Sequence, residues 1–184
     1  MGKVNTNKTY LISDTHFGDN EKGIINFERR PFQSRMDMID KLVEYWNSIV
    51  GPEDRVYHLG DVFWGMTDEE RKLVISRLNG EKYLVMGNHD MDRTTEYWRS
   101  LGFKEAYDVP VILNNFVILS HEPLYMVDGP YVNIFGHVHG NKAYKDLSET
   151  SFCVCVERDT MNYRPISLSE ILNEIQIVRD KGCE

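Results

Sequence analysis

Residues 135–140, FGHVHG, place two histidines one residue apart between glycines. Alternate residues of an extended chain point to the same side, so we expect His137 and His139 to reach the same place. The chain has only six histidines, and two imidazoles on one face are suited to binding a metal ion. The end of a half-buried strand gives the same pattern by chance. The remaining polar residues therefore have to decide between a metal site and a structural pair.

Similar side chains follow the other expected strands. In open α/β sheets, ligands bind in the crevice beyond the carboxyl ends of the strands, so we expect these side chains to share one crevice. They are Asp14 and His16 after residues 9–13, Asp61 after residues 55–59, Asn88, His89 and Asp90 after residues 82–86, and His121 after residues 116–119. His58 lies inside an expected strand and is interpreted as structural. Asp90 is expected to orient a neighbour or cap a helix.

The hydrophobic pattern predicts the elements that carry these residues. Apolar residues at helical spacing predict helices over residues 37–50, 68–78 and 92–101, alternating with the first three strands. Further strands are expected over residues 109–113, 116–119, 132–135 and 152–156, and a capping box predicts a closing helix over residues 167–179. The fold class is therefore α/β with two packed sheets. We expect one domain over residues 1–184, with a long loop over residues 18–35 of the kind that is usually functional or mobile.

The ligand types restrict the choice of metal. Imidazole, carboxylate and one amide oxygen, without thiolate, suit Mn²⁺, Fe²⁺, Zn²⁺, Co²⁺ or Ni²⁺. Seven candidate ligands are too many for one ion and fit two. Of the three cysteines, Cys153 and Cys155 are interpreted as small buried side chains in a reducing compartment, with a C-x-C metal site as the weaker alternative. A cytoplasmic location follows from this interpretation.

Composition limits the partners. The 184 residues carry a net charge of −8, so we do not expect the protein to bind long nucleic acid through an electropositive face. No apolar run approaches the length of a membrane span, and no membrane partner is expected. If the protein acts on phosphates, the positive charge has to be local or has to come from a cofactor.

The order of the motifs resembles that of the calcineurin-like metallophosphoesterase family. D-x-H, G-D-x-x, G-N-H-D, S-H-E-P and G-H-x-H follow one another between residues 10 and 140, as in the family's short bacterial and phage members. The resemblance implies a two-sheet β-sandwich flanked by helices in four layers, with a dinuclear metal site at the carboxyl edge of the strands. Manganese is the first expectation for both ions. The implied roles are Asp14, His16 and His139 on one ion, Asn88, His121 and His137 on the other, Asp61 bridging both, and His89 as a catalytic residue that binds neither.

The resemblance also implies an activity. The expected reaction is hydrolysis of a phosphodiester or phosphomonoester by metal-activated hydroxide, with His89 protonating the leaving oxygen. The expected substrate is a small phosphorylated molecule, with nucleotides among the candidates. A nuclease of the same family and a non-catalytic scaffold on this fold are the alternatives, and the presence of His89 argues against the scaffold. The sequence does not set the oligomeric state.

Two further features of residues 17–32 have two interpretations each. Arg29 and Arg30 either clamp a distal charge of the substrate or are solvated arginines on a loop. Phe17 and Phe32 either form a lid that stacks on substrate or belong to the core.

Overall fold

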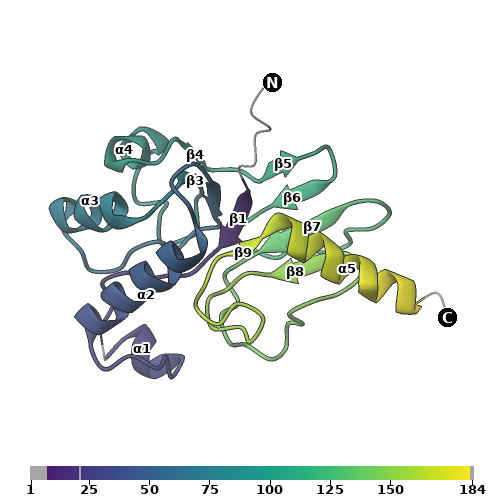
Figure 1. Ribbon diagram of the computed structural model, residues 1–184, viewed down its shortest axis with the longest axis horizontal. Helices are drawn as coiled ribbons and strands as arrows, with labels where there is room; N and C mark the ends of the chain where they lie inside the picture. The colour runs from purple at the N-terminus through teal and green to yellow at the C-terminus, as the bar shows by residue number, and fades with distance from the viewer. Residues whose placement is uncertain (1–7, 21, 183–184) are drawn as a thin grey trace.

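The computed structural model describes residues 8–20 and 22–182, and within them the strands form two sheets (Figure 1). The five-stranded sheet has the order β4-β3-β2-β1-β9, and the four-stranded sheet has the order β5-β6-β7-β8. The strands of the first sheet are β1 Thr9–Ile12, β2 Arg55–His58, β3 Glu81–Val85, β4 Glu105–Tyr107 and β9 Ile166–Ser167. Those of the second are β5 Val111–Leu113, β6 Val117–Leu119, β7 Val132–Phe135 and β8 Ser151–Cys153.

Strand direction brings the polar turns to one edge of the molecule. Strands β1 to β4 run parallel to one another, and so do β6, β7 and β8, whereas β9 and β5 at the ends of the two sheets pair antiparallel. The carboxyl ends of strands within each parallel set therefore lie at the same edge. The two sheets meet there, because Ser13, just after β1, pairs with Cys155, and its N–H donates to the carbonyl of Val154 at 3.0 Å.

Helices flank the two sheets. They are α1 Ile24–Phe27, α2 Arg35–Ile49, α3 Asp68–Arg77, α4 Thr95–Leu101 and α5 Leu168–Gly182. Figure 1 shows α2, α3 and α4 on the side of the five-stranded sheet, whereas α5 packs against β1, β8 and β9. The expected α/β fold with two sheets flanked by helices is confirmed. Among the described residues, no helix is both long enough and apolar enough to cross a membrane.

The core explains why β1 reads as a continuous apolar run. Leu11 and Ile12 are almost completely buried, as in strands of a parallel sheet that is covered on both faces. Trp46 of α2 and Trp98 of α4 are the largest fully buried side chains. Phe17 and Phe32 also lie in this core, so the lid interpretation of these two phenylalanines is wrong.

Helix caps account for most differences from the predicted boundaries. Helix α2 begins two residues earlier than expected because Ser34 accepts a hydrogen bond from the N–H of Asp37. Helix α4 begins three residues later than expected, after the cap Thr94. The capping box of the last helix is present between Ser167 and Glu170.

Short elements were missed by the sequence pattern. Strands β4 and β9 have only three and two residues, too few for an alternation to be visible. The segment 18–35 contains the one-turn helix α1. Cys153 and Cys155 are buried with their sulfur atoms 3.4 Å apart, as expected for neighbours on one face, and Cys183 lies outside the described residues.

Candidate metal centre

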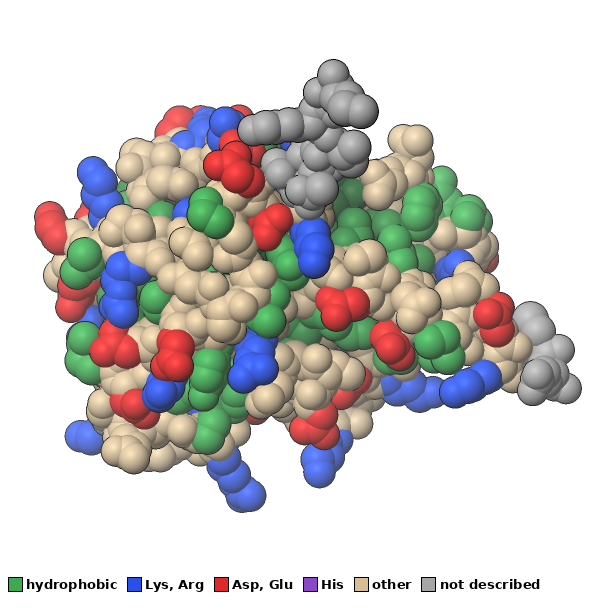
Figure 2. Space-filling view, viewed as in Figure 1, with side chains coloured by type: hydrophobic (Ala, Val, Ile, Leu, Met, Phe, Trp, Pro, Cys, Tyr) green, Lys and Arg blue, Asp and Glu red, His purple; other side chains and the backbone are tan. Residues whose placement is uncertain are grey.

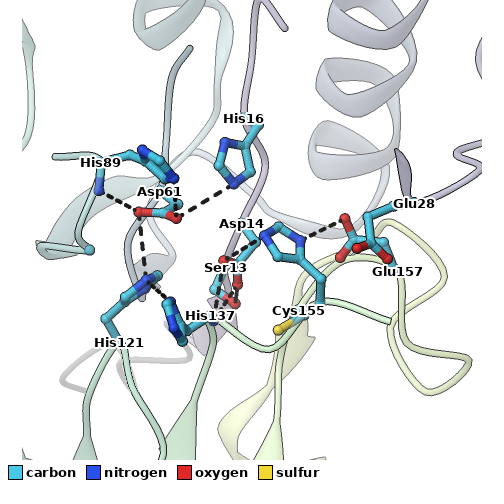
Figure 3. A network of polar contacts seen from close by, with 12 residues as sticks. Ser13, Asp14, His16, Glu28, Asp61, His89, His121, His137, Cys155 and Glu157 are labelled. Carbon is cyan, nitrogen blue, oxygen red and sulfur yellow. Dashed lines mark hydrogen bonds and ion pairs between the residues drawn. The ribbon is translucent and has the colours of Figure 1, made fainter. Parts of the chain in front are cut away.

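Seven side chains from five turns converge at the common edge of the two sheets. Figure 3 labels Asp14, His16, Asp61, His121 and His137 among them. One set of side chains offers ligand atoms that all lie within 4.8 Å of one another, and a second set does the same. The first set is Asp14, His16, Asp61 and His139, and the second is Asp61, His121 and His137. Asp61 belongs to both sets, which is the arrangement of two neighbouring sites that share one carboxylate.

Unusual backbone conformations aim these side chains inward. Asp14, His16, Asp61, His137 and His139 all have positive φ, between 45° and 70°. A non-glycine residue in this left-handed region costs about 1–2 kcal/mol, so the surrounding structure has to hold it. Hydrogen bonds between the turns do so, because the N–H of Asp14 donates to Gly60 and that of His16 donates to Asp61, each at 3.0 Å.

Asp14 and His16 present a charged and a neutral ligand. Burial alone would raise the pKa of Asp14, but the surrounding histidines and the Ser13 hydroxyl lower it to about 2, so its carboxylate is ionised. Burial holds the pKa of His16 well below its usual range, so its imidazole is neutral. The buried Nε2 of His16 has no hydrogen-bond partner and lies 3.5 Å from Asp61 Oδ2. A buried nitrogen without a partner beside a carboxylate fits a cation between them.

His139 is oriented by a buried carboxylate. Its Nδ1 donates to Glu157 Oε1 at 3.1 Å, which leaves Nε2 facing Asp14 Oδ1 at 3.7 Å. Burial alone would lower the pKa of His139, but Glu157 and Asp14 raise it to about 9. A ligand nitrogen must carry no proton, so metal binding at His139 has to displace this proton.

The second set brings lone pairs together. His121 Nδ1 lies 2.7 Å from the carbonyl oxygen of Leu59, so in the neutral ring Nδ1 carries the proton and Nε2 has the lone pair. Nε2 lies 3.0 Å from Asn88 Oδ1 and 3.1 Å from His137 Nδ1. His137 Nδ1 is also 3.0 Å from Asn88 Oδ1. Two imidazole nitrogens and an amide oxygen this close together form a donor set that suits a divalent cation.

Asp90 fixes the shared carboxylate in place, as expected from the sequence. Its carboxylate accepts hydrogen bonds from the N–H groups of Asp61 at 2.7 Å, Val62 at 3.2 Å and Gly87 at 2.9 Å. Burial raises the pKa of Asp61, an effect that His121 partly offsets. Positive charge on both sides of Asp61 would keep it ionised.

His89 lies beside both sets but belongs to neither. Its N–H donates to Asp61 Oδ1 at 3.0 Å, and its side chain is 37% exposed. The ring Nε2 is 3.9 Å from Asp61 Oδ2, and the ring stands perpendicular to Trp64 with centroids 4.7 Å apart. His89 therefore faces the open side of the cluster, where a proton can be exchanged with a bound molecule.

Comparisons with known proteins agree with this geometry. The sequence profile of the calcineurin-like phosphoesterases matches residues 8–154. An uncharacterized protein of Methanocaldococcus jannaschii is 32% identical over 174 residues, which cover 92% of each chain. The chain belongs to the calcineurin-like phosphoesterase family.

Two further proteins are similar to this chain. The gene 66 protein of Mycobacterium phage L5 is 34% identical over 85 residues, covering 45% of this chain and 39% of the phage protein. The crystal structure of a protein of unknown function from Aquifex aeolicus superposes with a TM-score of 0.65 at 28% identity, covering 90% of this chain and 98% of the other.

Arg30 does not have the position of a substrate clamp. Its side chain is fully buried, and it donates to the carbonyl oxygens of Thr15 at 2.7 Å and Asp14 at 2.6 Å as well as to Glu157. Arg30 therefore holds the turn that contains Asp14 from behind, and both interpretations of it, as a substrate clamp and as a solvated arginine, are wrong. Arg29 is exposed with φ 53°, and its role as a substrate ligand stays a prediction.

His58 is structural, as expected. Its Nε2 lies 2.9 Å from the hydroxyl of Thr15, and burial lowers its pKa to about 3. The Thr15 hydroxyl in turn donates to the carbonyl of Val62 at 3.0 Å. His58 thus positions the residue between Asp14 and His16 without taking part in the cluster.

Glu157 is the residue that sequence reasoning missed. It follows β8 by four residues, as the expected ligands follow their own strands. Glu157 belongs to none of the five family motifs. It directly follows the strand expected over residues 152–156, in which the two cysteines were the residues interpreted. The signal was a lone acid at the end of an apolar run, CVCVE.

Proposed function

We propose that this phosphoesterase hydrolyses phosphodiester bonds of a small substrate, with two divalent ions, manganese first among them, as cofactors. The observation that supports this most directly is the position of His89. It is a half-exposed histidine beside two ligand sets that share Asp61, and neither set includes it.

Different residues serve charge compensation and proton transfer. Divalent ions held by the two ligand sets would lower the pKa of bound water to roughly 7 and would compensate the charge of a bound phosphate. Asp61 belongs to both ligand sets; Asp90 holds its backbone N–H, and the N–H of His89 holds its Oδ1. His89 places an exchangeable proton on the open side, where it protonates the leaving oxygen as the P–O bond breaks. A strongly basic leaving oxygen, such as that of a sugar hydroxyl, gains most from such an acid.

The charge of the protein favours a small substrate over long nucleic acid. On the face drawn in Figure 2, where no histidine is visible, Lys and Arg side chains are scattered among Asp and Glu. The net charge of −8 disfavours the polyphosphate backbone in the same way.

The test is metal-dependent turnover. The full chain is stripped with a chelator, reloaded with Mn²⁺ and assayed on bis-p-nitrophenyl phosphate beside p-nitrophenyl phosphate. We expect turnover only with metal. His89→Ala is expected to bind Mn²⁺ normally but to cleave the diester about 100-fold more slowly, at the low end for a general acid because p-nitrophenolate needs little protonation.

The controls separate the possible outcomes. Asp92→Asn, an exposed change near His89, is expected to leave both rates unchanged. Equal losses on diester and monoester in His89→Ala would contradict the diester preference. Absence of metal-dependent turnover on either substrate would favour a non-catalytic scaffold.

A further inference from the structure

Two exposed aromatic side chains stand at the mouth of the cluster. A cavity of about 360 Å³ is lined by His16, His89 and His139 together with Phe27 and Trp64. Phe27 is 81% exposed and Trp64 is 46% exposed. Large aromatic surface left in water beside a polar cluster is typical of a ligand site.

Trp64 is held in place by its neighbours. Its backbone N–H donates to the backbone carbonyl of Phe17 at 3.0 Å. Phe63 directly before it and Met66 two residues after it are buried. A Cβ on Gly18 would lie 2.8 Å from the carbonyl oxygen of Trp64, which shows how closely the two turns pack. The exposure of the indole is therefore a property of the fixed turn.

Phe27 is likewise held in an exposed position by the structure around it. It ends α1, whose Ile24 and Ile25 are buried. The carboxylate of Asp19 accepts from the N–H of Ile24 at 2.9 Å and so fixes the start of that turn. Phe27 also lines a second cavity of about 480 Å³ with His137, His139 and Tyr144. The ring thus stands between two hollows that both open on candidate metal ligands.

The aromatic and polar side chains that line this cavity suit a planar, partly polar group of the substrate. The leaving oxygen lies on the side of His89, and Trp64 packs against the His89 ring, so the aromatic walls meet whatever the leaving oxygen carries. Nucleobases stack on exposed aromatic side chains, and each stacked base strengthens binding about 5- to 150-fold. Lys22, which lines the same cavity, adds a hydrogen-bond donor for a base edge or sugar hydroxyl.

We propose that Phe27 and Trp64 form a base-stacking subsite and that the substrate is a small nucleotide. This inference rests on the proposed phosphoesterase function and adds the class of the group attached to the leaving oxygen. The phosphate is placed at the two ligand sets, and the base lies between the two rings.

The test compares ligands that differ only in the base. The probes are the methylene phosphonates of adenosine 5′-phosphate and of ribose 5-phosphate, in which carbon replaces the ester oxygen and prevents hydrolysis. Titration calorimetry on the Mn²⁺-loaded full chain is expected to show at least about tenfold tighter binding of the adenosine compound. Phe27→Ala and Trp64→Ala are each expected to remove most of this preference and leave the ribose compound unaffected. Phe27→Tyr and Trp64→Phe are expected to retain it.

Intrinsic fluorescence gives a second measurement. Trp46 and Trp98 are each 1% exposed, so acrylamide quenching reports Trp64, and the adenosine compound is expected to protect it. Leu73→Ala, an exposed change on α3 away from the cavities, serves as the control that keeps the preference.

The outcomes separate this inference from the proposed function. Equal affinity of the two phosphonates for the wild type would overturn the subsite even if bis-p-nitrophenyl phosphate is hydrolysed. An equal loss of affinity for both phosphonates in the alanine variants would also overturn it, because the rings would then only support His89. A base preference in a protein without turnover would support the subsite and overturn the hydrolase.

Discussion

Glu157 fixes the orientation of the His139 ring within the first ligand set. Its Oε1 accepts from His139 Nδ1 at 3.1 Å and from Arg30 Nε at 2.9 Å, and its side chain is 4% exposed. Partners of this kind fix the ring orientation of a metal-binding histidine and raise its basicity. Arg30 balances the buried charge and ties the pair to the turn that contains Asp14.

We predict that Glu157→Gln weakens Mn²⁺ binding about 10- to 100-fold. The amide keeps an oxygen of the same shape but loses the charge that favours a donating His139 Nδ1. Titration calorimetry of the stripped protein with Mn²⁺ measures the change.

Glu28→Gln is the matched control. Glu28 also lies next to the histidine turn, but it accepts from the N–H of Gly140 at 3.1 Å and not from an imidazole. Its substitution is expected to leave the affinity within a few-fold of wild type. If both variants bind Mn²⁺ like the wild type, Glu157 does not position His139.

At the scale of elements, glycines set how closely the strand ends approach. Gly136 follows β7 and lies against the turn after β1, where an added Cβ would be 2.5 Å from Ser13 Oγ and 2.7 Å from Asp14 Oδ2. The N–H of His137, the next residue, donates to Asp14 Oδ2 at 2.9 Å. The absence of a side chain at Gly136 thus permits the contact that joins the two sheets at the site.

We predict that Gly136→Ala displaces Asp14, lowers Mn²⁺ affinity and destabilises the fold by about 1–3 kcal/mol, as overpacking does. Urea unfolding and calorimetry measure the two effects. Gly140→Ala in the same motif is the control, because its Cβ would meet only the carboxylate end of Glu28, which can turn aside. Similar results for the two variants would contradict a role of Gly136 in the close contact between the two strand ends.

The sequence predicted elements where hydrophobic runs and caps were long enough to be read. The first three strands, β7 and the capping box at Ser167 were predicted within a residue or two, and parallel strand ends alone explain why polar turns meet. Strands β4 and β9 are defined by pairing partners far away in the sequence, which no local pattern contains. Arg30 was misjudged for the same reason, since its carbonyl and carboxylate partners become visible only in the folded chain.

At the scale of the whole molecule, the centre is shared between the two sheets. Asp14, Asp61 and Asn88 follow strands of the five-stranded sheet, whereas His121, His137 and His139 follow strands of the four-stranded sheet. Divalent cations held at this edge would allow an acidic protein to bind phosphate there despite its net charge of −8. The sequence predicted this convergence from the polar residues that follow its expected strands, but not the left-handed turns or Glu157, which depend on contacts between the sheets.

Anomalous X-ray diffraction from crystals of the Mn²⁺-loaded protein tests this account most directly. We predict two manganese peaks for each chain, one bordered by Asp14, His16 and His139 and the other by Asn88, His121 and His137, with Asp61 in contact with both. A single peak, or two peaks of which only one touches Asp61, would contradict the dinuclear centre.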